Sequence, residues 1–386
     1  MTFAVQFLEP SPETLALSAP QAASRLSAAM SILPVERVII GWDLPEHLIA
    51  ACAGEASRAR SSLFLWHPLL TFSASSLPPR ADWQTLGPSG DPIPGFAGMP
   101  EFTFMCPNRP EVFEAVLARL QKAIHSGPFQ GIFLDRIRWP SPTADPSRLM
   151  ACFCPACQRA AIAQGIDLAG VRHLLAAPRN RAELARFLLN PASAGDSASD
   201  WPFLRRLMDF RARSITRLVR AAAELIRAHG LGVGLDCFSP SLTSLVGQEL
   251  AALDAYCDWI KFMVYGHTYA PAGLPFELLN LQKWVNPAPL DSNGLPSDVL
   301  ESTGLPPAFL ANEIRAACAC GIKNAWAGIE LVDLPGVTRL NDAQIQSDLR
   351  AFRAANPAGL VLSWDLRHIS DARLQLVADN FCPGNV

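Results

Sequence analysis

Short apolar runs alternate with longer amphipathic runs along most of the chain. A short run rich in β-branched and aromatic side chains is typical of a buried strand, whereas apolar positions spaced three and four apart are typical of a helix packed on a sheet. The pattern predicts eight strands, at residues 3–10, 35–45, 61–70, 131–139, 230–238, 258–266, 324–333 and 359–367. It predicts helices at about residues 20–32, 46–59, 109–125, 203–229, 308–320, 341–355 and 370–380.

The order of these elements indicates the fold class. Strands that alternate with helices favour a parallel sheet in an α/β protein, and eight such units are the number that closes as a (β/α)8 TIM barrel. A doubly wound open sheet is the competing fold, but it would carry a glycine-rich phosphate loop after its first strand. The segment "FLEPSPETLAL" at 7–17 contains no glycine. We therefore expect residues 1–386 to form a single (β/α)8 barrel domain.

The chain is longer than a barrel requires. A TIM barrel typically needs about 250 residues, and this chain has 386. The excess predicts long insertions after strands 3, 4 and 6, at about residues 73–105, 140–202 and 267–307. Because barrel active sites lie at the ends of the strands from which these loops leave, we expect the second and third insertions to form a wall over the barrel mouth. Trp139 and Tyr269 are expected to line it.

Composition narrows the classes of function. The sequence is 50% hydrophobic and 17% charged with a net charge of −3, which suits a large buried core and gives no electrostatic basis for binding nucleic acid or an anionic membrane. No run of about 18 apolar residues is present, and the first residues lack the pattern of a signal peptide. We expect a cytoplasmic protein with no nucleic-acid or membrane partner, and a homo-oligomer stays open.

Polar and aromatic side chains stand where the predicted strands end, and in a barrel these ends meet at one mouth. Carboxylates there can accept hydroxyl protons while flat rings stack on the C–H faces of a sugar, so the pattern favours a carbohydrate substrate. The candidate substrate-binding residues are Trp42, Asp43, Trp66, His67, Arg136, Arg138, Lys261, Tyr265, His267, Trp364 and Asp365.

Three carboxylates are candidates for catalysis: Asp135, Asp236 and Glu330. Each follows an apolar run that should be buried, where an ionised group needs a partner or a purpose. Glycoside hydrolysis usually needs two carboxyl groups facing each other across the scissile bond. By analogy with other hydrolase barrels, strands four and seven supply them, so Asp135 would be the acid or second carboxylate and Glu330 the nucleophile or base. Asp236 is the rival for either role.

Structural explanations compete with these assignments. An aspartate at a strand end often caps the next turn, which applies above all to Asp43. Glu9 could lie at the rim, and Asp365 could pair with Arg367. Arg136, Arg138 and Lys261 could be the charge partners of the buried carboxylates instead of contacts to a substrate.

A second signal is a cluster of cysteines, "CFCPAC" at 152–157. Cys152, Cys154 and Cys157 offer three thiolates, and a closed structural zinc site uses four ligands. Cys106 is the candidate fourth ligand because it opens the helix before strand four while the cluster follows that strand. Three buried thiols at a helix start, or an iron–sulfur cluster, are the alternatives. The other cysteines, dispersed along the chain, are expected to be mostly small buried side chains.

The order of "CPN" at 106–108, "GIFLDRIRW" at 131–139 and "CFCPAC" at 152–157 resembles the glycoside hydrolase family 42 β-galactosidases over roughly residues 100–165. The resemblance implies a structural zinc held by Cys106, Cys152, Cys154 and Cys157. That family has Asp-Asn-Glu after strand four, with the Glu as general acid/base, whereas this chain has Asp135-Arg136-Ile137. The β-galactosidase activity is therefore not implied. "LDRIRWP" at 134–140 and the segment 234–266 resemble a broader group of glycoside-hydrolase-like barrels.

Together these observations predict a glycosidase, an O-glycosyl hydrolase of carbohydrate metabolism, with paired carboxylates at the carboxyl-terminal mouth of the barrel. Two alternatives stay open. A non-catalytic carbohydrate-binding barrel would explain the missing Glu, and a sugar-acid lyase or isomerase would use Lys261, Arg136 and Arg138 against a carboxylate.

Overall fold

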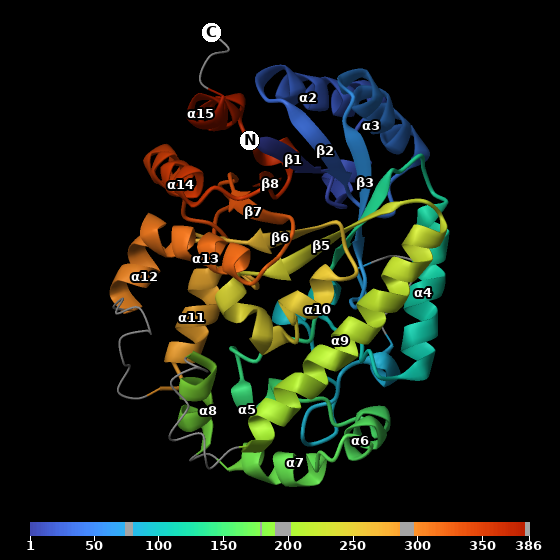
Figure 1. Cartoon of the computed structure of the whole chain (residues 1–386), viewed down its shortest axis with the longest axis vertical. Helices are drawn as coiled ribbons and strands as arrows, with labels where there is room; N and C mark the ends of the chain where they lie inside the picture. The colour runs from blue at the N-terminus through green and yellow to red at the C-terminus, as the bar shows by residue number, and fades with distance from the viewer. Residues whose placement is uncertain (74–79, 178–179, 190–201, 286–296, 383–386) are drawn as a thin grey trace.

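A computed structural model describes residues 1–73, 80–177, 180–189, 202–285 and 297–382 (Figure 1). Eight parallel strands form a closed barrel in sequence order, and β8 pairs with β1. The strands are β1 (Thr2–Phe7), β2 (Val35–Ile40), β3 (Ser62–Pro68), β4 (Gly131–Asp135), β5 (Gly232–Phe238), β6 (Trp259–Met263), β7 (Ala325–Glu330) and β8 (Gly359–Ser363). The closed order confirms the (β/α)8 barrel and excludes the doubly wound sheet, whose edges stay open.

Helices cover the outside of the barrel (Figure 1). They are α1 (Pro12–Leu15), α2 (Ala19–Ile32), α3 (Glu46–Ala59), α4 (Pro110–Ile124), α9 (Pro202–Ala228), α10 (Leu250–Asp254), α13 (Pro307–Ala319), α14 (Asp342–Ala355) and α15 (Asp371–Phe381). Local sequence explains several of their starts. In α2, Ser18 and Gln21 form a capping box, and Asn341 and Gln344 do the same in α14, so the first free amides of both helices are satisfied.

Large aromatic rings fill the barrel interior on the amino-terminal side of the mouth. The ring of Trp259 stacks on Phe133 at 5.1 Å between centroids and contacts Trp326 at 5.3 Å. Gly234 makes room for this packing, because a Cβ there would lie 2.5 Å from the Trp259 ring. The guanidinium of Arg37 also packs on this cluster, 4.1 Å from the centroid of Trp326. This part of the interior is therefore a packed core, and the end of the barrel where active sites of this fold lie is the carboxyl-terminal mouth.

The expected insertions follow β3, β4 and β6. The first contains the short 3-10 helices η1 (Ala81–Trp83), η2 (Phe96–Gly98) and η3 (Pro100–Phe102). The second contains α5 (Pro146–Leu149), α6 (Pro155–Ile162), α7 (Leu168–Ala176) and α8 (Asn180–Leu189). The third contains α11 (Leu274–Gln282) and α12 (Ser297–Thr303). In Figure 1, α5 to α8 gather around the start of α9 at one end of the molecule.

A buried arginine of α9 fastens the second insertion to the barrel. Arg211 is 1% exposed and donates hydrogen bonds to the backbone carbonyls of Leu149, Met150 and Leu245 at 2.6–2.9 Å. Leu149 and Met150 lie at the carboxyl-terminal end of α5, and Leu245 lies in the 3-10 helix η6 (Pro240–Val246), so one side chain bonds to carbonyls of two segments far apart in the sequence. Across the described ranges, no helix combines the length and the apolar character needed to cross a membrane.

Candidate active site

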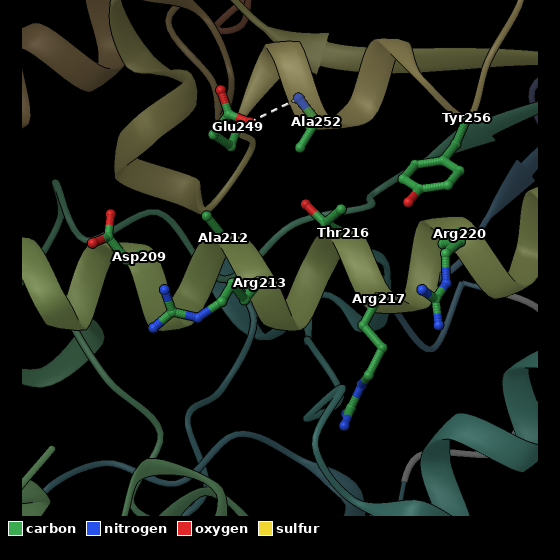
Figure 2. A pocket seen from close by; sticks show the side chains of 9 residues that line it. All are labelled: Asp209, Ala212, Arg213, Thr216, Arg217, Arg220, Glu249, Ala252 and Tyr256. Carbon is green, nitrogen blue, oxygen red and sulfur yellow. Dashed lines mark hydrogen bonds between the residues drawn. The ribbon is translucent and has the colours of Figure 1, made fainter. Parts of the chain in front are cut away.

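Of the depressions on the molecule, one of about 390 Å³ lies outside the barrel, between α9 and α10 (Figure 2). Its three arginines are engaged elsewhere: Arg213 donates to Gln164, Arg217 donates to the carbonyl of Pro107 and to Asn108, and Arg220 lies 3.7 Å from Glu224. Figure 2 shows the side chains of Arg213 and Arg217 directed away from Glu249 and Tyr256 on the opposite wall. Because its polar groups do not converge, this depression is not the candidate site.

The barrel mouth contains a cavity of about 310 Å³, named the mouth cavity below. Its floor consists of inward-facing side chains near the ends of several strands, and its walls come from the first and third insertions and from the loops after β7 and β8. The floor residues are Gln6, Trp66, Asp135, Asp236, Lys261 and Met263. Buried ionisable groups that converge in a concave site are the usual mark of a binding or catalytic centre.

Strand register places the charged floor residues side by side. Leu134 of β4 pairs with Leu235 of β5, so Asp135 and Asp236 follow at the same level on neighbouring strands. Asp236 pairs in turn with Lys261 of β6. Since successive side chains on a strand face opposite sides, all three point into the mouth.

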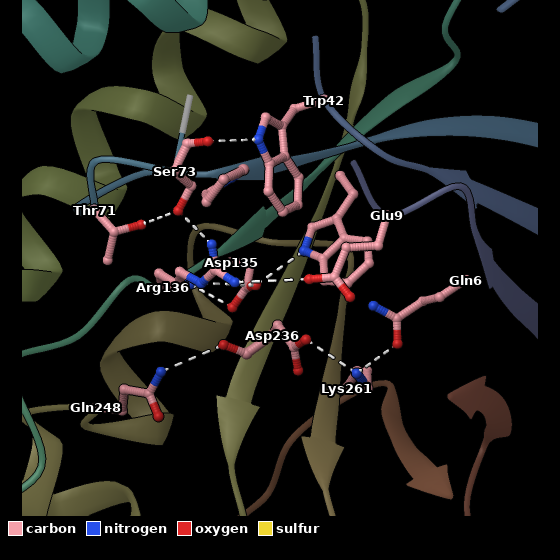
Figure 3. Close-up of polar contacts among 12 residues, drawn as sticks. Gln6, Glu9, Trp42, Thr71, Ser73, Asp135, Arg136, Asp236, Gln248 and Lys261 are labelled. Carbon is pink, nitrogen blue, oxygen red and sulfur yellow. Dashed lines mark hydrogen bonds and ion pairs between the residues drawn. The ribbon is translucent and has the colours of Figure 1, made fainter. Parts of the chain in front are cut away.

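Hydrogen-bond donors surround Asp135. Its carboxylate accepts a hydrogen bond from the Trp66 indole N–H at 2.9 Å and another from the backbone N–H of Arg136. The Arg136 guanidinium lies 3.8 Å from Asp135 and 3.9 Å from Glu9, and it also donates to Ser73 (Figure 3). These contacts hold the Asp135 carboxylate in a fixed orientation at the mouth.

Asp236 is more deeply enclosed. One of its carboxylate oxygens accepts a hydrogen bond from the Lys261 ammonium at 3.0 Å, and the other has no partner among the described residues. Burial raises the pKa of Asp236 to about 7, although the charge of Lys261 opposes the shift. The site therefore holds two neighbouring carboxyl groups in different surroundings, an arrangement that separates proton donor from acceptor.

Lys261 is positioned by two further residues. Its ammonium donates to the Gln6 side-chain carbonyl at 2.8 Å, and Ser363 donates to the same oxygen at 2.9 Å. Gly328 on β7 makes room for the lysine stem, because a Cβ there would lie 2.6 Å from Lys261 Cε. Burial alone would lower the pKa of Lys261, but the charge of Asp236 outweighs it and the pKa is raised.

Glu9, at the end of β1, is a third carboxylate on the mouth cavity. Burial raises its pKa to about 7, against the attraction of Arg136. Its side chain nevertheless remains 33% exposed, so solvent screens it more than Asp236, whose side chain is 3% exposed.

Aromatic rings form much of the wall. Trp364, after β8, stacks on Tyr265 with centroids 5.7 Å apart, and both line the cavity. The first insertion adds Phe96, which is 43% exposed, and Phe102. The third insertion contributes Thr268, Ala270, Pro271 and Ala272. Trp139 and Tyr269 do not line the cavity: their polar atoms donate to the carbonyls of Arg211 and Leu300, respectively.

Glu330 ends β7, but its carboxylate is directed at backbone and does not line the mouth cavity. It accepts a hydrogen bond from the backbone N–H of His267 at 2.6 Å, and burial raises its pKa to about 8. The His267 imidazole pairs with Asp348 of α14 at 2.9 Å. The three residues form a buried cluster between β6, β7 and α14, apart from Asp135 and Asp236.

The remaining sequence candidates divide between the mouth and its surroundings. Trp66, Arg136, Arg138, Lys261, Tyr265 and Trp364 line the mouth cavity. Trp42 lies behind Trp66, at 5.4 Å between ring centroids, and donates to the Ser73 carbonyl. Asp43 and His67 line a separate cavity of about 180 Å³ beside α4. Asp365 accepts hydrogen bonds from the backbone N–H groups of Leu8 and Glu9 at 3.2 Å, so it fixes the end of β1.

Sequence reasoning missed Gln6 and Phe96 and gave Glu9 only a rim position. Gln6 had a signal, because a lone amide in the apolar strand "FAVQF" needs a buried partner. Phe96 had none, since it lies in an irregular loop whose path depends on contacts with distant segments, such as Phe276 at 5.3 Å between centroids.

The cysteine cluster comes together as expected from the sequence. Cys106, Cys152, Cys154 and Cys157 are all buried, and their sulfur atoms lie within 4.8 Å of one another. Backbone or side-chain N–H groups of Leu86, Cys157 and Asn108 donate to these sulfurs at 3.3–3.4 Å. Four sulfurs with N–H donors fit a thiolate-bound metal ion. Of the other cysteines, Cys52, Cys237 and Cys257 are buried, whereas Cys318 and Cys320 are exposed and Cys382 is partly exposed.

No protein-family model matches the chain, and no curated protein matches it by sequence. The structure is similar to the glycoside hydrolase domain of PgaB (BpsB) from Bordetella bronchiseptica, with a TM-score of 0.58 and 14% identity over 97% of this chain and 98% of that one.

β-Galactosidases are further structural neighbours. The enzyme from the psychrophilic Marinomonas ef1 has a TM-score of 0.55 and 10% identity over 98% of this chain and 59% of that one. The enzyme from Halorubrum lacusprofundi has a TM-score of 0.57 and 11% identity over 98% and 57%. This chain thus spans less than two thirds of the length of either β-galactosidase. At these identities the comparison establishes the fold: the chain shares its closed eight-stranded barrel with glycoside hydrolases.

Proposed function

We propose that this protein is a glycoside hydrolase in which Asp135 and Asp236 are the paired carboxylates. The observation that supports this most strongly is their position: neighbouring strands present both side chains at one level of a cavity walled by aromatic rings. Cleavage of a glycosidic bond usually uses two carboxyl groups, and aromatic ring faces can stack on the sugar beside them.

The two carboxyl groups suit different roles. Asp236, whose pKa is raised to about 7 by burial, can hold a proton near neutral pH and donate it to the leaving oxygen. Asp135, whose carboxylate is oriented by hydrogen bonds from Trp66 and the backbone of Arg136, suits the second role, as nucleophile or base. We assign the pair to Asp135 and Asp236 in place of Asp135 and Glu330, because the Glu330 carboxylate is bonded to the backbone of His267.

The test compares three substitutions that keep side-chain shape and remove ionisation: Asp135→Asn, Asp236→Asn and Glu330→Gln. Hydrolysis of a panel of aryl glycosides should fall about 10²–10⁴-fold in the first two, because acid–base assistance is worth about that much. Glu330→Gln is the matched control and should keep wild-type turnover per folded molecule. Thermal melts run alongside separate lost chemistry from lost folding. Loss of turnover in Glu330→Gln with full activity in Asp236→Asn would instead support the pair Asp135 and Glu330.

A non-catalytic carbohydrate-binding barrel is the second candidate. It is favoured by the hydrogen bond between Lys261 and Asp236, which neutralises one of the two carboxylates. This function would show as sugar binding by the wild type with no cleavage of any glycoside in the panel.

We also propose that Cys106, Cys152, Cys154 and Cys157 hold a structural zinc ion. Four cysteines complete a tetrahedral shell and leave no position for substrate, so the metal would stabilise the second insertion without entering the reaction. The site joins the start of α4 to the start of α6, two segments that have no strand pairing between them.

A further inference from the structure

The structure contains a second cavity next to the mouth cavity, of about 240 Å³. Both cavities are lined by Phe96, Phe102, Arg138 and Pro271, so they meet along a shared wall. The second cavity continues between the first and second insertions towards Phe276 of α11. Ligand sites usually measure about 300–1,000 Å³, and the two neighbouring cavities taken together fall in that range.

Arg138, at the junction, is a buried cation without an anionic partner among the residues that the structure describes. It is 5% exposed, and its guanidinium lies between the rings of Phe104 and Phe238, 4.4 and 4.6 Å from their centroids. Its one side-chain hydrogen bond within the described ranges goes to the Trp139 carbonyl at 3.2 Å. Within those ranges, no carboxylate oxygen lies within the 4.0 Å of an ion pair with Arg138. Burial lowers its pKa to about 10, so it stays charged at neutral pH.

The other cations of the mouth cavity differ from Arg138 in this respect. Lys261 is paired with Asp236 at 3.0 Å, and Arg136 lies 3.8 and 3.9 Å from Asp135 and Glu9. A buried charge without a partner is costly, so proteins usually pair such groups or use them to bind a ligand.

Glu277 of α11 is the carboxylate that acts most strongly on Arg138, yet its oxygens are already engaged. One accepts hydrogen bonds from the hydroxyl groups of Ser141, at 2.6 Å, and Thr143. The other accepts from the backbone N–H of Ala272 at 2.9 Å. Glu277 therefore holds residues of the second and third insertions together. The N–H donors of Arg138 that face the cavities are then available to bind a ligand.

We propose that the substrate is an acidic oligosaccharide that occupies both cavities, with an anionic substituent bound by Arg138 at their junction. The proposal rests on the proposed function for the place of cleavage in the mouth cavity. The guanidinium fork matches the planar oxygens of a carboxylate, and a sulfate ester offers the same acceptors. Phe96 and Phe276 supply ring faces for a second sugar unit.

The experiment measures binding by calorimetry with acidic oligosaccharides of one to four units: galacturonate, glucuronate and mannuronate oligomers, and sulfated galactan oligomers. Each is compared with its methyl ester or its desulfated form, which removes the charge and keeps the sugar. We expect affinity to rise from one unit to two or more, and to fall about tenfold or more when the charge of the preferred ligand is removed, as for a charge-assisted hydrogen bond.

Three variants locate the effect. Arg138→Met, which keeps a long apolar stem between the two phenyl rings, should bind the charged and uncharged forms equally. Phe276 lines the second cavity only. Phe276→Ala should therefore weaken the binding of oligomers and leave the affinity for single sugar units unchanged. This variant still tests the proposal if Arg138→Met does not fold. Arg213→Met is the matched control, since Arg213 lies on the outer face of α9 (Figure 2).

The proposal is overturned if no acidic oligosaccharide binds more tightly than its uncharged counterpart, or if single units bind as tightly as oligomers. Its failure is distinct from failure of the proposed function. If the wild type cleaves neutral glycosides and Asp236→Asn does not, the proposed hydrolase function stands and the proposal of an acidic substrate fails. If the wild type binds an acidic oligomer tightly but never cleaves it, the acidic ligand is supported and the proposed hydrolase function fails.

Discussion

Asp236 and Glu330 show that a shifted pKa alone does not identify a catalytic group. Burial raises the pKa of both carboxyl groups, to about 7 and about 8. Asp236 faces a cavity and keeps one oxygen unbonded among the described residues, whereas Glu330 accepts a hydrogen bond from the backbone of His267. Geometry distinguishes them: the first can meet a substrate, and the second secures the loop after β6.

Glu330→Gln should change how stability depends on pH. Between pH 5 and pH 8 the folded state of the wild type keeps the Glu330 proton that the unfolded state, with an ordinary pKa near 4.5, has lost. The free energy of unfolding should therefore decrease as pH rises across this range. Glutamine has no proton to lose, so the variant should lose less stability than the wild type. Thermal melts at pH 5, 6.5 and 8 measure the difference.

His267 contributes in the same direction, which the comparison must take into account. Its burial lowers its pKa, but the hydrogen bond to Asp348 outweighs burial and the pKa is raised, so its stabilising effect is also lost as pH rises. A part of the slope should therefore persist in Glu330→Gln. Identical slopes in the variant and the wild type would show that Glu330 is ionised in the folded protein across the whole range.

For single residues, the sequence predicted which polar side chains are buried. It predicted less well whether each side chain faces the barrel mouth. The alternation of a strand separates Trp66, inside the barrel, from His67, outside it, and this could have been read from "FLWHP". The position of Glu330 could not, because its partner is a backbone N–H from a loop far away in the sequence.

At the scale of elements, apolar periodicity predicted the existence and type of all eight strands and the major helices. Helix α3 has the predicted bounds, Glu46–Ala59. Every strand except β5 was predicted too long at its carboxyl end. For β4, the prediction reached residue 139, whereas the strand ends at Asp135 and the chain turns at Arg136, whose φ is +54°. Residues beyond the turn are buried by the insertions, so their apolar character does not distinguish strand from loop.

Cys154→Ser should destabilise the second insertion. Removing one ligand weakens a tetrahedral metal site whose binding energy is coupled to folding, so the melting temperature should fall by roughly 5–10 °C. Elemental analysis of the wild type should find about one zinc per chain, and of the variant much less. Cys52→Ser is the matched control, because Cys52 is buried in α3 away from the cluster. Wild-type protein that contains neither zinc nor iron, after expression with both metals, would contradict the metal site.

At the scale of the whole molecule, the count and order of elements were sufficient to predict the barrel, since eight alternating units have few ways to bury an apolar parallel sheet. The shape of the mouth was not predictable to the same degree. Its walls consist of irregular segments from the first and third insertions and from the loops after β7 and β8. The second insertion, which lines the neighbouring cavity, is positioned by long-range contacts such as those of Arg211 with Leu149 and Leu245. Such contacts leave no periodic pattern in the sequence.

Gln6 connects the closure of the barrel to the chemistry of its mouth. Its side-chain carbonyl accepts from Lys261 of β6 and from Ser363 of β8, so one amide joins β1 to both. In Gln6→Ala two buried donors lose an acceptor, which should cost about 1–3 kcal/mol of the free energy of unfolding. The Lys261 ammonium should then turn fully to Asp236 and lower the pKa of that carboxyl group.

If Asp236 is the general acid, this shift has a defined sign. An acid with a lower pKa loses its proton at lower pH, so the alkaline limb of the rate–pH profile should move towards acid in Gln6→Ala, and turnover at pH 7 should fall about tenfold or more. Gln130→Ala is the matched control, because Gln130 pairs with the backbone of Leu63 at the opposite end of the barrel. The control should keep the wild-type profile. Gln6→Ala with a lower melting temperature but an unmoved alkaline limb would mean that Gln6 only closes the barrel, and that the Asp236–Lys261 pair does not set the pH dependence of the reaction.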